Sequence, residues 1–274
     1  MSLLPQIPSF LFDQTSPSIL WCYTGGGHFF DEIFTQILKL NNKSVPICFV
    51  FSNAGALVAN RYGFFWKLTH SDIKKEYFHF IFEYTVAQYN IEAMLTDAEF
   101  SYSIIFEDPA FSVAIALANT QASCIIACPL TANTAAKLVS GIADSFISNL
   151  LSNGLKSGKK VVIYPTDAIL QKIKTKLPVR QIKSTSSDCI DASVCRFNAL
   201  KESSTNNIIF LPQFCVGCQA CVKKYPTVFS FGDEIDLQIR KVDFLNIQKL
   251  GAEMTIFKTP KEIIDFVDQN FPLH

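Results

Sequence analysis

The chain has 274 residues, 24 basic and 24 acidic side chains, and 49% hydrophobic residues. A chain this apolar buries enough surface to fold, which excludes low-complexity disorder, and its balanced charge argues against nucleic acid as a partner. No stretch approaches the roughly 18 to 20 apolar residues that cross a bilayer, and residues 1–12 lack the basic start of a signal peptide, so we expect a soluble, cytoplasmic protein with no membrane partner.

Short apolar runs alternate with amphipathic segments along the chain, a pattern typical of βα units around a parallel sheet. Strands are predicted at residues 18–23, 45–51, 103–106, 124–128 and 160–164. Helices are predicted after the first two of these strands and over residues 133–151, and residues 64–99 also have a helical pattern with many aromatics. The sequence therefore predicts an α/β fold of the Rossmann-like or flavodoxin-like class, with helices flanking a parallel sheet.

The pattern changes from about Gln181 to Gly232, where polar residues cluster and five of the nine cysteines occur. We interpret this stretch as a module inserted into the α/β domain. The α/β rhythm then returns with a strand at 235–240, a short helix, a strand at 254–257 and a final helix. The predicted organisation is thus a first part of the α/β domain at 1–180, the insertion at 181–232 and the return to the α/β domain at 233–274.

Nine cysteines is an odd number, which fits reduced thiols or metal ligands better than a disulfide framework. Four of them lie on predicted strands, and we interpret these four as small buried hydrophobes. They are Cys22, Cys48, Cys124 and Cys128.

Three cysteines of the insertion, Cys215, Cys218 and Cys221, have the spacing of a ferredoxin-type iron–sulfur motif. Tyr225 stands where that motif has its fourth cysteine. Cys195 is the candidate for the missing ligand, because the segment that it begins resembles the end of a ferredoxin half and lies twenty residues before Cys215.

The preceding ferredoxin half is degenerate. The positions of its three leading cysteines hold Thr185, Asp188 and Asp191, and Cys189 lies nearby but out of register. One ligand set is thus deleted and another survives, so we predict a single [4Fe–4S] cluster. Its ligands would be Cys195, Cys215, Cys218 and Cys221. A structural zinc site and a decayed module without metal are the alternatives.

Polar turns follow three of the predicted strands. Residues 24–28 contain three glycines between a strand and a helix, where glycine lets a phosphate or a flavin edge approach the backbone. Ser52 and Asn53 follow the second strand, and residues 131–134 follow a later one. Because the carboxyl ends of parallel strands share one edge, we expect the three turns to form one site. An ordinary βα turn and an ordinary helix N-cap are the alternatives for the first two.

These motifs resemble those of the homo-oligomeric flavin-containing cysteine decarboxylase superfamily, and especially its archaeal-type flavoprotein and dihydromethanopterin reductase branch. Residues 24–30 are similar to the branch's Thr-Gly-x-Gly-His-Phe-Leu turn, and residues 129–134 to the family's Pro-Ala-Ser-Ala-Asn-Thr flavin motif. Segments 137–149, 165–167 and 240–243 also match. A ferredoxin-like insertion before the last of these segments belongs to the dihydromethanopterin reductase type.

The resemblance implies FMN as cofactor, with an FMN-binding flavoprotein domain formed by residues 1–180 and 233–274. It implies that residues 25–28 and Ser52 lie near the phosphate and ribose, and residues 131–134 near the flavin ring. The implied cofactor-binding residues are Thr24, Gly25, Gly26, Gly27, His28, Ser52, Asn53, Thr131, Ala132, Asn133 and Thr134. It also implies a homotrimer or a multiple of trimers, because family members place the flavin where subunits meet.

FMN together with an iron–sulfur cluster predicts an electron-transfer oxidoreductase. The cluster would accept electrons from ferredoxin or a similar donor, and FMN would collect two before reducing an organic substrate. The resemblance implies that this substrate is pterin-like, such as dihydromethanopterin. The alternatives are a flavin-dependent decarboxylase of a cysteine-containing substrate, whose Pro-x-Met-Asn-x-x-Met-Trp motif is not found in the chain, and a non-catalytic FMN and iron–sulfur electron carrier.

Histidines are few, and the catalytic acid or base is not evident from the sequence. His28 is a candidate, although its place at a helix N-terminus makes a local hydrogen bond an equal alternative. His70 and His79 lie in the aromatic segment without a neighbouring acid or thiol, and we interpret both as structural.

Overall fold

A computed structural model describes residues 7–83, 90–105, 107–167, 172–183, 190–203 and 207–271. The positions 185, 188 and 189 of the degenerate ferredoxin half lie outside these residues. Within them, seven parallel strands form one sheet in the order β13-β6-β5-β1-β2-β3-β4. The strands are β1 (Ile19–Tyr23), β2 (Ile47–Phe51), β3 (Phe78–Glu83), β4 (Ser101–Ile105), β5 (Cys124–Leu130), β6 (Val161–Pro165) and β13 (Thr255–Ile256). The predicted parallel α/β sheet is confirmed.

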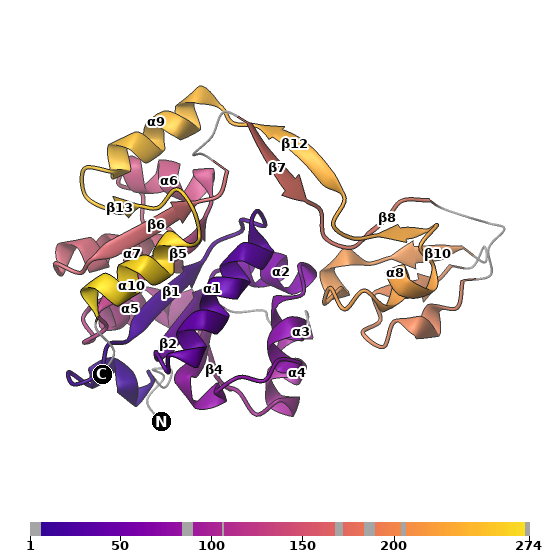
Figure 1. Ribbon diagram of the computed structural model, residues 1–274, viewed down its shortest axis with the longest axis horizontal. Coiled ribbons are helices and arrows are strands. Elements are labelled where there is room, and N and C mark those ends of the chain that lie inside the picture. Colours follow the sequence, from indigo (N-terminus) through magenta and orange to yellow (C-terminus); the bar gives the residue numbers. More distant parts are fainter. Residues whose placement is uncertain are drawn as a thin grey trace.

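Helices cover both faces of this sheet (Figure 1). One face packs against α1 (Phe30–Asn42), α2 (Asn53–Arg61), α3 (Phe64–Thr69), α4 (Ile91–Asp97) and α10 (Glu262–Asn270). The other face packs against α5 (Glu107–Ala118), α6 (Ala132–Val139), α7 (Phe146–Lys156) and α9 (Lys241–Leu250). In α1 the buried side chains Phe30, Ile33, Phe34, Ile37 and Leu40 recur at helical spacing, which puts one apolar stripe on the sheet.

The core on the α1 side is rich in phenylalanine. Phe49 lies beside Phe80, and Phe51 beside Phe82, with ring centroids 5.2 Å apart in both pairs. Side chains alternate between the two faces, so the neighbouring positions of each strand fill the other core. The four strand cysteines are fully buried in the two cores, which confirms their interpretation as small hydrophobes.

Two helix predictions are wrong in part. Residues 64–99 contain β3 between α3 and α4, and β3 was missed because a strand buried on both faces has a continuous apolar run without period-two alternation. The predicted helix 133–151 is broken into α6 and α7. Gly141 lies between them with φ of +70°, a left-handed conformation that ends a helix.

The strand predicted at 235–240 forms, but not in the sheet. Instead β12 (Glu234–Gln238) pairs antiparallel with β7 (Lys172–Lys176), and this ribbon extends away from the sheet (Figure 1). The alternating polar and apolar residues of β7 explain this placement, because they suit a strand that is covered on one face.

We call residues 179–232, at the far end of the ribbon, the cysteine module. It contains α8 (Ala220–Lys224) and two small antiparallel pairs, β8 (Arg180–Gln181) with β11 (Phe229–Ser230) and β9 (Leu200–Glu202) with β10 (Ile208–Phe210). Short 3-10 turns complete the described part of the chain, at Ser9–Phe12, Lys75–Tyr77, Ala192–Val194 and Pro212–Phe214. No helix within the described residues is long and apolar enough to cross a membrane.

The cysteine module packs against the turn between α2 and α3. Gly217 approaches Gly63 so closely that a Cβ on Gly217 would lie 2.5 Å from the Gly63 nitrogen. Both glycines have positive φ, of +65° and +81°. Beside them the guanidinium of Arg196 lies 4.7 Å from the ring centroid of Trp66, a cation–π contact that adds to the docking.

His79 of β3 gives the fold a pH dependence. Its ring is 4% exposed and contacts the hydroxyls of Ser101 and Ser103, and burial lowers its pKa from 6.5 to about 4. The folded state therefore favours the neutral ring, and the resulting stability is present above pH 6.5 and lost as the pH falls through 4. We expect the titration of His79 to lower the free energy of unfolding by about 3 kcal/mol over this window.

Urea denaturation at a series of pH values measures this decline. A His79→Gln variant cannot titrate at this position, so its decline between pH 6.5 and 4 should be smaller than that of the natural chain. Equal declines in the two proteins would assign the acid sensitivity to other groups.

Candidate functional site

Three strand ends meet at the edge of the sheet where its order reverses. Strands β2 and β5 lie on either side of β1, and ligands of open α/β sheets bind at such a switch point. A cavity of about 510 Å³ lies there, between the turns after β1, β2, β5 and β6 and the start of α7. Seven of the predicted cofactor-binding residues line it: Thr24, Gly25, Ser52, Asn53, Thr131, Asn133 and Thr134.

The turn after β1 is tied to the turn after β5. The Thr24 hydroxyl donates to the carbonyl of Pro129 at 2.8 Å and accepts the backbone N–H of Thr131 at 2.9 Å. Thr131 in turn caps α6, because its hydroxyl accepts the N–H of Thr134. These bonds hold two polar turns in fixed register at one wall of the cavity.

The turn after β2 is held by a close approach to β1. Ser52 caps α2 by accepting the N–H of Gly55 at 3.0 Å, and its own N–H donates to the carbonyl of Tyr23. A Cβ on Gly55 would lie 2.2 Å from that carbonyl oxygen. Glycine is therefore required at this position if Ser52 and Asn53 are to reach the cavity.

Gly26, Gly27, His28 and Ala132 do not line this cavity. A Cβ on Gly26 would lie 2.7 Å from the Thr166 hydroxyl, which is buried without a hydrogen-bond partner among the described residues. The Nδ1 atom of His28 contacts the hydroxyl of Thr175 on β7 at 2.5 Å, and burial lowers the pKa of this histidine. This contact ties the start of α1 to the ribbon, and the role of His28 toward the flavin stays a prediction.

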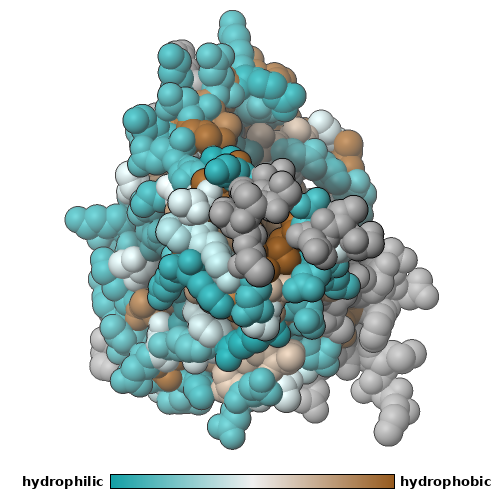
Figure 2. All heavy atoms as spheres, turned by 90° about the vertical axis from the view of Figure 1, so that its right-hand side faces the viewer, coloured by the Kyte–Doolittle hydropathy of each residue, from teal (hydrophilic) through white to brown (hydrophobic). Residues whose placement is uncertain are grey.

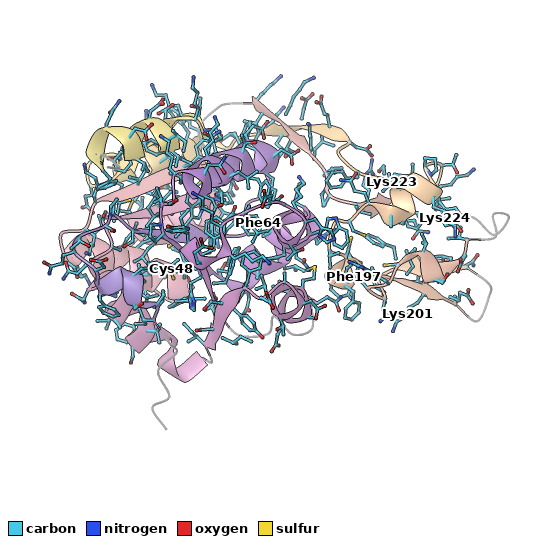
Figure 3. All side chains as sticks on the ribbon, turned by 60° about the horizontal axis from the view of Figure 1, so that its bottom comes forward. Cys48, Phe64, Phe197, Lys201, Lys223 and Lys224 are labelled. Carbon is cyan, nitrogen blue, oxygen red and sulfur yellow. The ribbon has the colours of Figure 1, made fainter. Side chains whose placement is uncertain are left out.

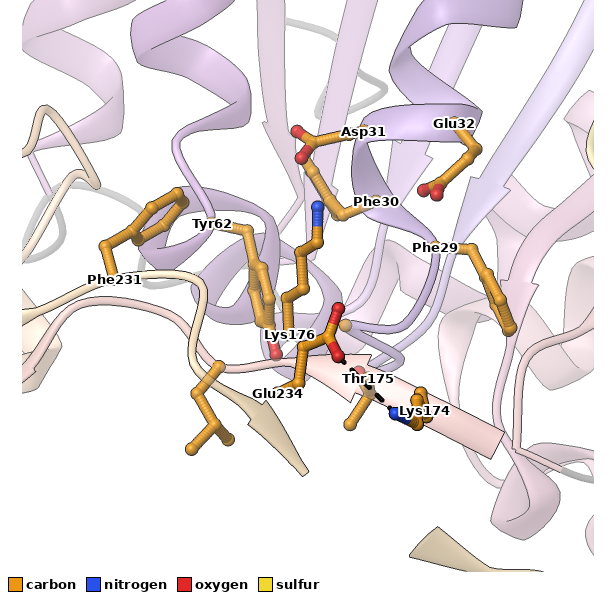
Figure 4. A pocket seen from close by; sticks show the side chains of 12 residues that line it. Phe29, Phe30, Asp31, Glu32, Tyr62, Lys174, Thr175, Lys176, Phe231 and Glu234 are labelled. Carbon is orange, nitrogen blue, oxygen red and sulfur yellow. Dashed lines mark ion pairs between the residues drawn. The ribbon is translucent and has the colours of Figure 1, made fainter. Parts of the chain in front are cut away.

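A second, smaller cavity of about 150 Å³ lies on the far side of the glycine turn. Figure 4 shows it between the first turn of α1 and the ribbon, where Lys174 and Glu234 form an ion pair 3.8 Å long. The ring of Tyr62 closes one side and stacks on Phe30. Gly25 lines the larger cavity and Gly27 lines the smaller one, so the glycine turn separates the two cavities.

Two carboxylates line the larger cavity. Glu83, the last residue of β3, accepts the N–H groups of Asn53 and Phe146, both at 3.3 Å. Asp167 accepts the N–H of Ala132 at 2.7 Å, and burial raises the pKa of its carboxyl. Sequence reasoning missed Glu83 because it took this part of the chain as helical, and a β3 assignment would have placed it at the carboxyl edge.

Lys137 is the positively charged side chain among the described residues that line the cavity. Its ammonium group forms an ion pair with Asp144 at 2.8 Å, which offsets its positive charge. With Glu83 and Asp167 also present, the described lining carries no excess of positive charge.

The volume of the larger cavity and most of its lining residues suit FMN. Its volume lies within the range of about 300–1,000 Å³ for ligand sites, and hydroxyl and amide groups line it together with apolar Ala54 and Ile147. Gly25 keeps the wall clear, since a Cβ there would lie 3.1 Å from the Cβ of Ala54. The carboxylates of Glu83 and Asp167 are the part of the lining that does not suit a phosphate.

The four predicted metal ligands line one small cavity of about 20 Å³ in the cysteine module. Burial raises the pKa of the Cys215 thiol to about 12, and the neighbouring thiols of Cys221, Cys218 and Cys195 add to this rise. Among the described residues, however, no three His, Cys, Asp or Glu side chains are grouped so that they could hold a metal ion. The cluster and the zinc alternative therefore stay predictions.

The Flavoprotein family profile matches residues 11–200 of the chain. Two curated relatives are named dihydromethanopterin reductase (acceptor). The relative from Methanocaldococcus jannaschii is 29% identical over 254 residues, which cover 90% of this chain and 94% of the relative. The relative from Methanosarcina mazei is 26% identical over 257 residues, which cover 90% and 97%. The predicted resemblance to this branch, and with it the prediction of an enzyme of the oxidoreductase class, is confirmed.

Among solved structures, Burkholderia xenovorans DmrB in complex with FMN, described as a cubic protein cage for redox transfer, has a TM-score of 0.51 to this chain at 15% identity. The match covers 94% of this chain and 96% of that chain. At this identity the likeness shows the fold alone.

Proposed function

The chain belongs to the Flavoprotein family, and on that premise we propose that it is an FMN-dependent oxidoreductase that reduces a dihydropterin or a similar organic substrate. The observation that carries the proposal is the meeting of three polar turns, after β1, β2 and β5, around one cavity at the switch point of the sheet. The curated relatives named dihydromethanopterin reductase supply the substrate class.

The residues of the cavity have distinct tasks in this proposal. Asn133 and Thr134 at the start of α6 would hydrogen-bond the flavin ring, and Ile147 would pack against its apolar part. Ser52 and Asn53 would bind at the ribityl phosphate end, with Gly25 leaving the space that the cofactor enters. FMN held there would supply two-electron reduction of the substrate and one-electron exchange with a donor.

We also propose that the cysteine module holds one [4Fe–4S] cluster. Its proposed ligands, Cys195, Cys215, Cys218 and Cys221, line a common cavity. A single zinc ion draws its four thiolates to about 2.3 Å from one point. A cubane cluster has one thiolate on each of four separate irons and therefore accepts more widely spaced thiols. The spacing of the cysteines supports the cluster over zinc, because three of the thiols follow one another in one loop, whereas structural zinc sites favour two separated Cys-x2-Cys pairs.

The electron donor is proposed to be ferredoxin or another small acidic protein that docks on the cysteine module. The end of the molecule that the module forms faces the viewer in Figure 2, and most of the residues coloured there are hydrophilic. Figure 3 shows Lys201, Lys223 and Lys224 on this module, and all three are exposed. Complementary charge speeds the encounter of two proteins, so Lys201 and Lys223 support an acidic partner, whereas an ion pair with Asp191 at 3.2 Å offsets the charge of Lys224.

A homo-oligomer built from trimers is part of the proposal. Four apolar side chains of the α9 region and the α6–α7 turn are between 39% and 53% exposed. Apolar side chains exposed in one region of a surface are typical of a contact between subunits. They are Ile142, Val242, Phe244 and Leu245. We expect light scattering to give a mass that is a multiple of three chains.

In the proposed domain organisation, residues 1–180 and 233–274 form the FMN-binding domain, and residues 181–232 form its iron–sulfur insertion.

Anaerobic stopped-flow tests the proposed activity. Protein loaded with FMN and reduced with dithionite should be reoxidised by a 7,8-dihydropterin in a single turnover, with the tetrahydropterin as product. Release of carbon dioxide from a cysteine-containing peptide would instead support the decarboxylase alternative. Reoxidation by protein acceptors without any reaction with dihydropterins would support the electron carrier.

A further inference from the structure

Glu83 occupies an anion position that two helices share. One carboxylate oxygen accepts the N–H of Asn53, the first residue of α2, and the other accepts the N–H of Phe146, the first residue of α7. The two helices lie on opposite faces of the sheet, and β3 ends between them. A single side chain therefore neutralises two helix N-termini at the wall of the cavity.

The surroundings of Glu83 are those of a phosphate site. Ser52 and Ser145 are the N-caps of the same two helices, and both line the same cavity as Glu83. Backbone N–H groups, hydroxyls and two helix N-termini are the groups that bind phosphate in proteins. The carboxylate is an internal anion held by these groups.

The geometry points to Glu83 as a residue that the phosphate of FMN displaces on binding. Because of this displacement, Glu83 lowers the preference of the site for FMN over riboflavin. This inference rests on the proposed binding of FMN. The hydrogen bonds that Glu83 accepts from Asn53 and Phe146 are 3.3 Å long, beyond the usual range of about 2.7–3.2 Å, whereas the bond from Ala132 to Asp167 is 2.7 Å. These two bonds are therefore weaker than the bond that holds Asp167, which lowers the cost of displacing Glu83 from the N–H groups.

Displacement makes the phosphate contribute less to affinity than its contacts would otherwise give. The entering dianion must break two bonds between Glu83 and the backbone, and it then lies near a like charge. In a Glu83→Gln variant the amide binds the same N–H groups more weakly and carries no charge. We expect this variant to bind FMN about tenfold more tightly, with riboflavin affinity changed less than about twofold.

Fluorescence titration of the apoprotein with FMN and with riboflavin measures the ratio of the two affinities. Asp167→Asn is the matched control, because it removes one carboxylate from the same cavity without touching the seat of Glu83. A tenfold rise of the ratio in Glu83→Gln with little change in Asp167→Asn supports the inference. An unchanged ratio in Glu83→Gln, or equal rises in both variants, overturns it.

The natural chain provides a second measurement that does not depend on the folding of a variant. In a crystal structure of its FMN complex, the phosphate should accept the N–H groups of Asn53 and Phe146, with the Glu83 carboxylate moved away. A phosphate bound elsewhere while Glu83 keeps both bonds would overturn the inference and leave FMN binding intact. Failure of the natural chain to bind either flavin would instead overturn the proposed function itself.

Discussion

A Cys215→Ser variant is expected to purify with flavin but without iron. Iron should fall from about four atoms per chain to near zero, because a [4Fe–4S] cluster needs a thiolate on each iron and a serine hydroxyl is a poor replacement. Cys215 is 8% exposed and has Cys195, Cys218 and Cys221 as neighbours. Burial raises the pKa of its thiol to about 12, so cluster assembly must also overcome the cost of deprotonating it.

The matched control is Cys48→Ser. Cys48 lies in β2 within the sheet, away from Phe197 and the rest of the cysteine module (Figure 3). This variant should keep its iron even if it loses stability, because it removes a buried thiol that has no part in the module. Iron, acid-labile sulfide and released flavin are measured on anaerobically purified protein. Full iron in Cys215→Ser, or equal loss in both variants, would contradict the ligand assignment.

A Gly55→Ala variant is expected to lose FMN binding and about 1–3 kcal/mol of stability, the usual cost of overpacking. The added methyl group would lie 2.2 Å from the carbonyl oxygen of Tyr23, and a backbone atom of a central strand cannot move aside. α2 must then shift away from β1. The shift carries Ser52 and Asn53 out of the cavity, since both lie at the N-terminus of this helix.

Gly251→Ala is the control for the glycine substitution itself. Gly251 ends α9, and its new methyl group would lie 3.0 Å from the terminal methyl of Ile256, which a side-chain rotation relieves. It would also lie 3.2 Å from the backbone oxygen of Gln248, a much milder approach than the 2.2 Å at Gly55. Urea denaturation and flavin titration are applied to both variants. If Gly55→Ala binds FMN as tightly as Gly251→Ala does, then the turn after β2 has no part in the cofactor site.

The first βα units could be predicted from the sequence because several local signals agree. In β1 and β2 an apolar run ends at a glycine-containing polar turn, and an amphipathic helix follows. The turn residues then follow from topology alone, since adjacent parallel strands bring Thr24, Ser52 and Thr131 to one edge. This part of the site needs no knowledge of side-chain packing.

Other features depend on contacts between distant segments. Glu83 was missed because β3 has the composition of a buried helix as well as of a buried strand, so its end could not be placed at the cavity. The pairing of β12 with β7 was missed because the alternation in β7 is typical of a strand covered on one face but does not identify its partner strand. The contact between His28 and Thr175 joins residues 147 positions apart and likewise has no local signal.

The contact between Gly217 and Gly63 limits how this chain can change through evolution. A side chain at position 217 would overlap the backbone at position 63, and each residue has a φ that disfavours any other amino acid. The cysteine module therefore depends on a matching contact surface in the rest of the chain. Moving it into another flavoprotein would require a host with a glycine at the matching α2–α3 turn, so we expect the two positions to be inherited as a pair.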